Sequence, residues 1–246
     1  MKKLVAYITT GYPDISFSED LALSLKDSGV DTLELGVPFS DPVADGPVIE
    51  EANLKSLQNG FKISDLIDLS KIIAPKIDTL WMGYMNPFYH RGLDYFINEA
   101  KRTGVNGFII PDLPYEESLE YKNIFLGANL SLISFVAPTD SKERIELIVK
   151  DSNKFIYLVA YAGITGSGVE EDLSKVIQDI RDVTKTPIYI GFGVNEKTAK
   201  SKSKNVDGVI VGSAFVKIMT DESIDYTQKI ERISTLAKHI KEEINS

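Results

Sequence analysis

The sequence has 246 residues, of which 43% are hydrophobic, a length and composition typical of one α/β barrel with a sizeable core. Acidic residues outnumber basic ones by 36 to 27, and the formal charge of −9 disfavours nucleic acids and anionic membranes as general partners. The lack of cysteine excludes disulfides, thiolate nucleophiles and cysteine-based metal sites, and it is compatible with a reducing cytoplasm.

No low-complexity linker or change of composition marks a domain boundary, so we predict a single domain over residues 1–246. The N-terminal apolar run is too short for a signal peptide or a membrane span. We therefore expect a cytoplasmic protein.

Eight short apolar runs recur in chain order, with helical patterns between them, at residues 4–9, 31–36, 78–84, 107–112, 130–137, 155–161, 187–193 and 207–213. The first helical pattern places Phe17, Leu21 and Leu25 on one face. Strands that alternate with helices run parallel and are covered on both faces, which explains why these runs are almost wholly apolar. Eight such units predict a closed (β/α)8 TIM barrel.

In such barrels the active site lies at the carboxyl ends of the strands. Glu34 stands between two leucines in the second predicted strand, where a lone carboxylate costs a large desolvation energy unless it has a partner. Burial would raise its pKa toward neutral pH, which suits a catalytic acid and base better than a structural ion pair. Asp41 and Asp45 follow in a loop typical of turns and caps, although Asp45 could point over the barrel mouth.

The seventh and eighth predicted strands end in GFG (191–193) and GS (212–213). The loops after these strands commonly bind phosphate in this fold, because glycine admits backbone N–H groups closely and a helix N-terminus favours an anion. Either pair alone is more typical of a tight turn. Their coincidence predicts a phosphate site and a phosphorylated small-molecule substrate.

Only His90 and His239 are present, which disfavours a Ser-His-Asp triad or a multi-histidine metal site. Lys154 precedes the sixth strand at its lower end, and no other lysine is placed at a strand top to form a Schiff base. Carboxylates and tyrosines therefore remain as candidates, and we expect no metal.

Five motifs, ELGVPFSDPVADGP, PDLPYEES, YLVAYAGITG, GFGV and VGSAFVKI, follow in an order and at a spacing that resemble the α subunit of tryptophan synthase over almost the whole chain. The first motif is highly specific, whereas GFG and GS alone indicate only the wider group of phosphate-binding barrels. The resemblance implies a lyase of tryptophan biosynthesis that cleaves indole-3-glycerol phosphate to indole and glyceraldehyde 3-phosphate.

The resemblance also implies roles for individual residues. It places the acid/base glutamate at Glu34 and the second catalytic carboxylate, which would accept a hydrogen bond from the indole N–H group, at Asp45. The residues implied to contact the rest of the substrate are Tyr157, Tyr84, Phe192 and Thr165. Those implied to contact the phosphate are Gly166, Gly193, Gly212 and Ser213.

The resemblance further implies a β subunit that carries pyridoxal phosphate, in an α2β2 heterotetramer, with no cofactor in this chain. Residues 161–169 would form a loop that closes over substrate. Two departures are visible: Ala160 and Tyr161 stand where family members often carry Ser-Arg, and the first strand is predicted almost at residue 1, without an additional N-terminal helix. We therefore expect the barrel bottom to be capped differently.

Two other functions stay open at this point. Another phosphate-binding barrel enzyme, such as a sugar-phosphate isomerase or epimerase, would use similar GFG and GS elements. A non-catalytic barrel would bind a partner without lyase activity, although the pair of Glu34 and Asp45 favours an enzyme.

Overall fold

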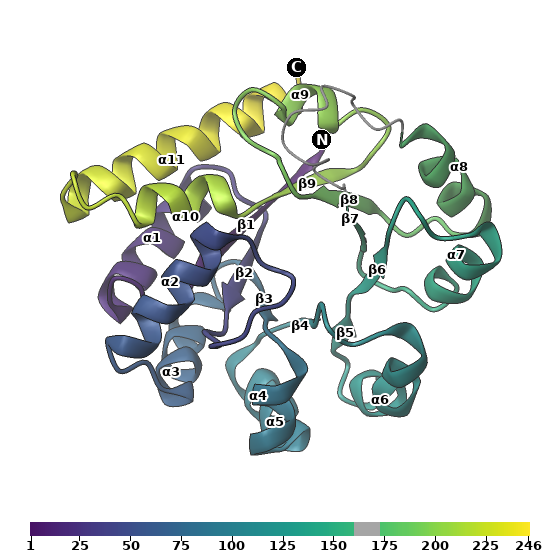
Figure 1. The fold of residues 1–246 in the computed structure, drawn as a ribbon, viewed down its shortest axis with the longest axis horizontal. Coiled ribbons are helices and arrows are strands. Elements are labelled where there is room, and N and C mark those ends of the chain that lie inside the picture. The colour runs from purple at the N-terminus through teal and green to yellow at the C-terminus, as the bar shows by residue number, and fades with distance from the viewer. Residues whose placement is uncertain (160–172) are drawn as a thin grey trace.

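The computed structural model describes residues 1–159 and 173–246. In these ranges the strands are β1 (Lys3–Thr9), β2 (Thr32–Gly36), β3 (Asp78–Met82), β4 (Gly107–Ile109), β5 (Ser131–Leu132), β6 (Ser134–Val136), β7 (Ile156–Val159), β8 (Ile188–Gly191) and β9 (Gly208–Val211). The helices are α1 (Ile15–Asp27), α2 (Pro47–Gln58), α3 (Ile63–Ile73), α4 (Met85–Arg91), α5 (Leu93–Thr103), α6 (Tyr115–Gly127), α7 (Lys142–Val149), α8 (Ser174–Val183), α9 (Ala199–Lys202), α10 (Ser213–Met219) and α11 (Tyr226–Glu243). The strands form a central ring and the helices surround it (Figure 1).

The sheet is wholly parallel, in the order β5-β4-β3-β2-β1-β9-β8-β7-β6. Its two end strands, β5 and β6, are consecutive in the chain and separated only by Ile133. The Ile133 N–H group donates to the carbonyl of Phe108 in β4, whereas Ser134 pairs with Ile156 in β7. The predicted TIM barrel is confirmed as a nearly closed barrel. The expectation of one continuous strand over 130–137 is wrong, because the chain changes its pairing partner at Ile133.

The core has two parts, as a barrel requires. Inside the ring, one layer is formed by Val5, Leu80, Ile109, Ile133, Phe155, Tyr189 and Ile210, and the rings of Phe155 and Tyr189 stack with centroids 4.5 Å apart. Outside it, a larger cluster packs the other face of the strands against the helices. Phe17, Leu21 and Leu25 of α1 are fully buried there, so the predicted helical face is confirmed.

Helix ends follow the local sequence. Asp14 caps α1 by accepting the Phe17 N–H at 2.8 Å, and Asp225 caps α11 by accepting the Gln228 N–H at 2.9 Å. Gly46 and Pro47 begin α2, since proline at the first helical position loses no intrahelical hydrogen bond. The start of α2 fixes where the loop from β2 returns to the barrel.

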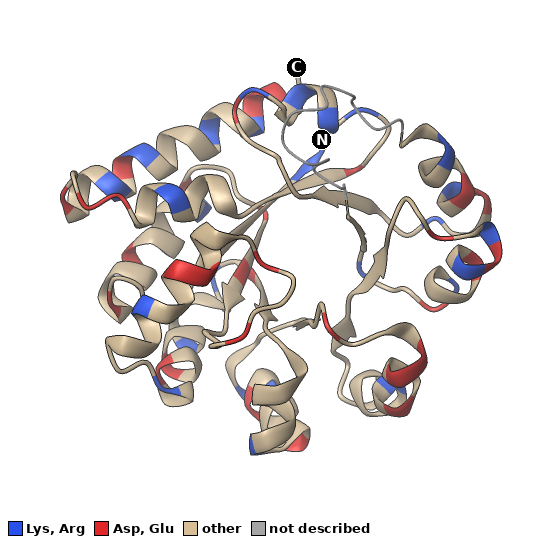
Figure 2. Ribbon diagram, in the orientation of Figure 1, with Lys and Arg blue, Asp and Glu red and all other residues tan. Residues whose placement is uncertain are grey.

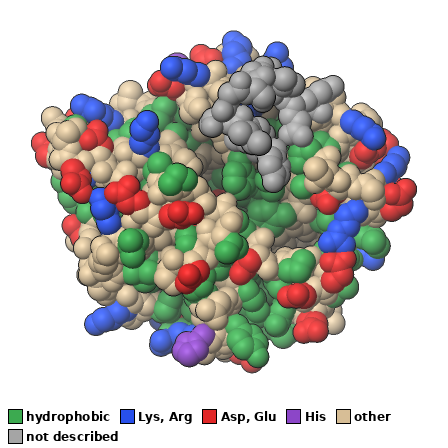
Figure 3. All heavy atoms as spheres, in the orientation of Figure 1, with side chains coloured by type: hydrophobic (Ala, Val, Ile, Leu, Met, Phe, Trp, Pro, Cys, Tyr) green, Lys and Arg blue, Asp and Glu red, His purple; other side chains and the backbone are tan. Residues whose placement is uncertain are grey.

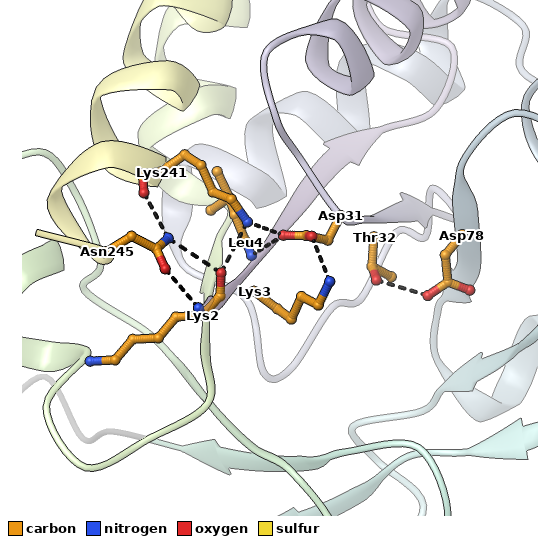
Figure 4. Close-up of polar contacts among 8 residues, drawn as sticks. All are labelled: Lys2, Lys3, Leu4, Asp31, Thr32, Asp78, Lys241 and Asn245. Atoms are coloured by element: carbon orange, nitrogen blue, oxygen red, sulfur yellow. Dashed lines mark hydrogen bonds and ion pairs between the residues drawn. The ribbon is translucent and has the colours of Figure 1, made fainter.

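Polar side chains tie together the amino ends of the strands, as Figure 4 shows. Asp31, just before β2, accepts hydrogen bonds from Lys3 at 2.9 Å, from the Leu4 N–H at 2.8 Å and from Lys241 of α11. Burial opposes its charged form, but these hydrogen bonds outweigh burial and lower the pKa of Asp31. Asn245 accepts the Lys2 N–H at 2.7 Å. The carboxyl end of α11 therefore caps this end of the barrel beside the start of β1.

Charged side chains lie mainly on the outer helices (Figure 2). Lys154 pairs with Asp78 at 2.9 Å, at the amino ends of β7 and β3, which agrees with its predicted place at the bottom of the barrel. Over residues 1–159 and 173–246, no helix combines the length and apolarity needed to cross a membrane.

Candidate active site

Glu34 lies in the middle of β2 and is only 2% exposed. In the parallel register it stands beside Tyr7 of β1 and Leu80 of β3, which places its side chain on the inner face of the barrel. Its Oε1 atom is buried and has no hydrogen-bond partner within the described residues. Burial, and then the nearby charge of Asp45, raise the pKa of Glu34 to about 8. A protonated carboxyl group at neutral pH therefore faces the barrel interior.

Two glycines make room for two inward tyrosines. A Cβ atom on Gly36 would lie 2.4 Å from the hydroxyl of Tyr7, and one on Gly191 would lie 2.3 Å from the ring of Tyr157. Both distances are shorter than real Cβ contacts, so glycine is needed at these strand ends. Burial raises the pKa of both tyrosines, with further contributions from Asp45 and Glu34, so both hydroxyl groups stay neutral.

Asp45 reaches the same cavity from the loop between β2 and α2. Its Oδ2 atom is buried without a hydrogen-bond partner among the described residues. Burial raises the pKa of Asp45 to about 6, against the opposing effect of hydrogen bonds from Tyr84 and Asn53. Tyr84 is 1% exposed, and its hydroxyl also accepts the Ala44 N–H at 3.1 Å. Tyr84 and Asn53 therefore fix the loop that carries Asp45.

A cavity of about 870 Å³ opens at the carboxyl ends of the strands. Figure 3 shows a hollow in this face with hydrophobic side chains at its floor. Glu34 and Asp45 both line the cavity, and its apolar walls include Tyr7, Met82, Ile109, Phe135, Tyr157, Phe192 and Ile210. The rings of Phe135 and Tyr157 stack with centroids 4.9 Å apart, and Phe192 meets Tyr157 edge-on at 6.3 Å. An aromatic ligand fits such walls.

The predicted phosphate residues lie in the part of the cavity wall formed after β8 and β9. Gly193 follows β8 with a φ of +67°, and Gly212 is the residue before the first turn of α10, where Ser213 begins the helix. Gly193, Gly212 and Ser213 all line the cavity, together with Lys197 and Lys217. Since the first N–H groups of a helix lack intrahelical partners, this wall is suited to an anion.

Most of the predicted site residues thus share one cavity, with three exceptions. Thr165 and Gly166 lie outside the described residues, as do Ala160 and Tyr161. Tyr84 is not among the residues that line the cavity, and its hydroxyl contacts Ala44 and Asp45 in the loop before α2. Its predicted contact with substrate stays a prediction, and the structure gives it a supporting position.

Sequence reasoning missed Tyr7 and Phe135, because each lies in an apolar run that is typical of ordinary core. The signal for Tyr7 was its register with Glu34 across β1 and β2. That signal is accessible only when the strands are aligned.

The comparisons with known proteins agree with this geometry. A family model described as tryptophan synthase alpha chain matches residues 1–245. The chain belongs to the tryptophan synthase alpha chain family. The tryptophan synthase alpha chain of Wolinella succinogenes is 60% identical over 100% of this chain and 97% of its own length. That of Dehalococcoides mccartyi is 38% identical over 99% and 96%.

Solved structures of the tryptophan synthase family support the fold as well. The tryptophan synthase alpha subunit from Campylobacter jejuni is 37% identical in sequence and has a TM-score of 0.87. The match covers 96% of this chain and 95% of that one. A tryptophan synthase structure from M. tuberculosis is 29% identical with a TM-score of 0.87, over 99% of this chain and 93% of that one. The chain is accordingly a lyase of tryptophan biosynthesis.

Proposed function

We propose that the chain cleaves indole-3-glycerol phosphate to indole and glyceraldehyde 3-phosphate, with Glu34 as the acid and base and Asp45 as its partner. The observation that carries the proposal is the pair of buried carboxyl groups in one aromatic-lined cavity, with pKa values raised to about 8 and about 6. At neutral pH this pair provides one proton donor and one anion. Two carboxyl groups with separated pKa values are the arrangement that divides acid and anion roles between them.

The proton of Glu34 starts the reaction. Transfer of this proton to C3 of the indole ring forms an indolenine cation, an electron sink beside the bond to the glycerol carbon. That bond then breaks, its electron pair returns to the ring, and the hydroxyl group on the departing carbon becomes the aldehyde. The hydroxyl proton returns to Glu34, so the acid is regenerated in the form in which it began.

Asp45 stabilises the charge that develops between these steps. As the ring becomes cationic, its N–H group becomes a stronger hydrogen-bond donor, and an ionised carboxylate is a suitable acceptor. With a pKa of about 6, Asp45 is mostly ionised at neutral pH. The buried Tyr84 holds its loop in place.

The remaining predicted residues bind the ends of the substrate. Tyr157 and Phe192 offer aromatic surface to the indole ring, and the wall of Gly193, Gly212 and Ser213 faces the phosphate. Thr165 and Gly166, in the predicted closing loop 161–169, complete this part of the proposal from sequence alone.

The proposal extends to the assembly. We infer one domain over residues 1–246, in the cytoplasm, that docks through its catalytic face onto a β subunit in an α2β2 heterotetramer. Exposed apolar side chains after β2 and β3 support docking, since Val43 in the loop before α2 is 81% exposed and Tyr89 in α4 is 72% exposed. The pyridoxal phosphate of the reaction sequence would then belong to the β subunit.

The test is indole release from indole-3-glycerol phosphate by the purified chain, alone and with a tryptophan synthase β subunit. Glu34→Gln keeps the shape of the side chain but cannot cycle a proton, so we expect its rate to fall by about 10²-fold or more. Glu117→Gln, at an exposed position on α6, is the matched control and should keep the wild-type rate. A folded wild type that releases no indole even with the β subunit would contradict the proposal and favour an isomerase or a non-catalytic barrel.

A further inference from the structure

Helix α6 packs loosely against the barrel. Only Phe125 of its thirteen residues is buried, whereas α5, with eleven residues, buries Leu93, Phe96, Ile97, Ala100 and Thr103. Leu119 and Leu126 of α6 are 45% and 51% exposed. Within residues 1–159 and 173–246, no protein therefore fills the face of α6 that should complete the packing around β5 and β6.

A second cavity, of about 260 Å³, lies between α6, α7, strands β5 and β6 and the segment that follows β4. The two helices are neighbours in the ring of Figure 1. One face of α6 forms a wall of the cavity, at helical spacings of three and four, and consists of Tyr115, Ser118, Leu119, Lys122, Phe125 and Leu126. Ile133 and Phe135 lie in the strand wall, so the cavity sits where the fifth predicted strand divides.

This second cavity is adjacent to the catalytic cavity. Pro111 and Phe135 line both the catalytic cavity and the cavity between α6 and α7. Phe135 also stacks on Tyr157, a wall of the catalytic cavity. The second cavity is nevertheless separate in its other walls, because Glu34, Asp45 and the phosphate residues line only the first.

The charges at the rim of the second cavity already have partners. Arg144 of α7 pairs with Glu116 of α6, with one hydrogen bond of 2.9 Å, and Lys122 of α6 pairs with Asp151 beyond α7. Asp140 accepts the Ala137 N–H at 2.7 Å. A ligand therefore meets leucine and aromatic surface inside, with the rim charges already balanced.

We propose that this cavity is a second binding site, for a neutral, flat aromatic molecule of one or two fused rings. An engineered cavity of about 150 Å³ lined by leucine, isoleucine and phenylalanine binds benzene. The cavity here has a similar lining and a larger volume, which leaves space for a second ring. The rings of Tyr115, Phe125 and Phe135 offer stacking and edge contacts that an aliphatic molecule would not use.

The experiment uses two halogenated probes of this class. Crystals of the wild-type chain are soaked in 5-bromoindole, and the bromine is located by its anomalous scattering. In parallel, 5-fluoroindole is titrated into the protein in solution and followed by ¹⁹F NMR. We expect bromine between α6 and α7, and saturable binding in solution in excess of what the catalytic cavity takes up.

Variants of exposed residues assign the signal to the site. Leu119→Trp and Leu126→Trp fill the cavity from its rim, and each should weaken binding there by about tenfold or more. Ile124→Trp is the matched control, because Ile124 is 42% exposed on the same helix but does not line the cavity, and it should change binding by less than about twofold. All three should release indole at the wild-type rate.

Two results would overturn the proposal. One is bromine confined to the catalytic cavity, together with no additional binding in solution. The other is binding between α6 and α7 that Leu119→Trp, Leu126→Trp and Ile124→Trp leave equally strong. Since indole release is measured separately, failure of the second site and failure of the proposed lyase activity give different results.

Discussion

Replacement of Glu34 by glutamine should make the protein more stable at alkaline pH while it removes the proposed catalytic acid. Burial in β2 raises the pKa of Glu34 from 4.5 to about 8. Between these two values the folded chain binds a proton that the unfolded chain has released, so wild-type stability falls as the pH rises. Below the lower pKa, Glu34 is protonated in both the folded and the unfolded chain. Above about pH 8 the loss of stability is complete.

The size of the effect follows from the same values. At about 1.4 kcal/mol per pH unit, the rise from 4.5 to about 8 corresponds to a loss of about 5 kcal/mol when fully developed. Glutamine has nearly the same shape and no charge to bury, so Glu34→Gln avoids this loss. Its advantage over wild type should widen by about 3 kcal/mol between about pH 5.5 and about pH 9.

The assay is urea unfolding of both proteins across this range, followed by the fluorescence of the single buried tryptophan, Trp81. Glu117→Gln, at an exposed position, controls for the general effect of removing one negative charge. Stability curves of wild type and Glu34→Gln that run parallel from acid to alkaline pH would refute the reasoning, because Glu34 would then have an ordinary pKa.

Three further predictions concern the surroundings of the site. Asp45→Asn should lower the pKa of Glu34, because the Asp45 charge contributes to raising it. A titration followed by ¹³C NMR of labelled glutamate carboxyl groups would detect the change. An unchanged titration of Glu34 would mean that the two groups do not interact. Gly191→Ala should lower the free energy of unfolding in urea by about 2 kcal/mol, since its Cβ would meet the Tyr157 ring at 2.3 Å. Tyr157→Leu should recover part of this loss. If Gly191→Ala costs the same with Tyr157 and with leucine at position 157, this contact is not the cause. Asp31→Asn should lower the free energy of unfolding by about 2 kcal/mol near neutral pH, because it leaves Lys241, which is only 14% exposed, without its charge partner. Wild-type stability in this variant would show that the network at the barrel bottom is not needed for stability.

The barrel could be predicted because its repeat is strong in the sequence. Apolar runs and helical patterns alternate over the whole chain, and parallel strands covered on both faces require that pattern. The division at Ile133 could not be predicted, because residues 130–137 form one apolar run and the change of partner from β4 to β7 is a tertiary event. The loose packing of α6 was not predicted either, because only the fold shows that no part of the described chain fills its inner face.

The candidate site was likewise only partly predictable from the sequence. Glu34 was visible as a carboxylate in an apolar strand, and Asp45 through its motif, and both face one cavity. Tyr7 was not distinguishable from core until the register placed it beside Glu34. Tyr84 was expected to contact substrate, and this stays a prediction; the path of the loop from β2 to α2 brings the Ala44 N–H onto the Tyr84 hydroxyl. Side-chain direction at a loop depends on that path, which short sequence patterns do not specify.

The central claim is that a protonated Glu34 and an ionised Asp45 together cleave the substrate. Its most direct test is the pH dependence of kcat/KM for indole release from indole-3-glycerol phosphate by the wild-type enzyme, because this ratio reports the ionisations of the free protein. The rate should rise with pH as Asp45 ionises, with a midpoint of about 6, and fall as Glu34 loses its proton, with a midpoint of about 8. A rate that continues to rise beyond about pH 9 would contradict the account, since the working form of Glu34 would then be its carboxylate.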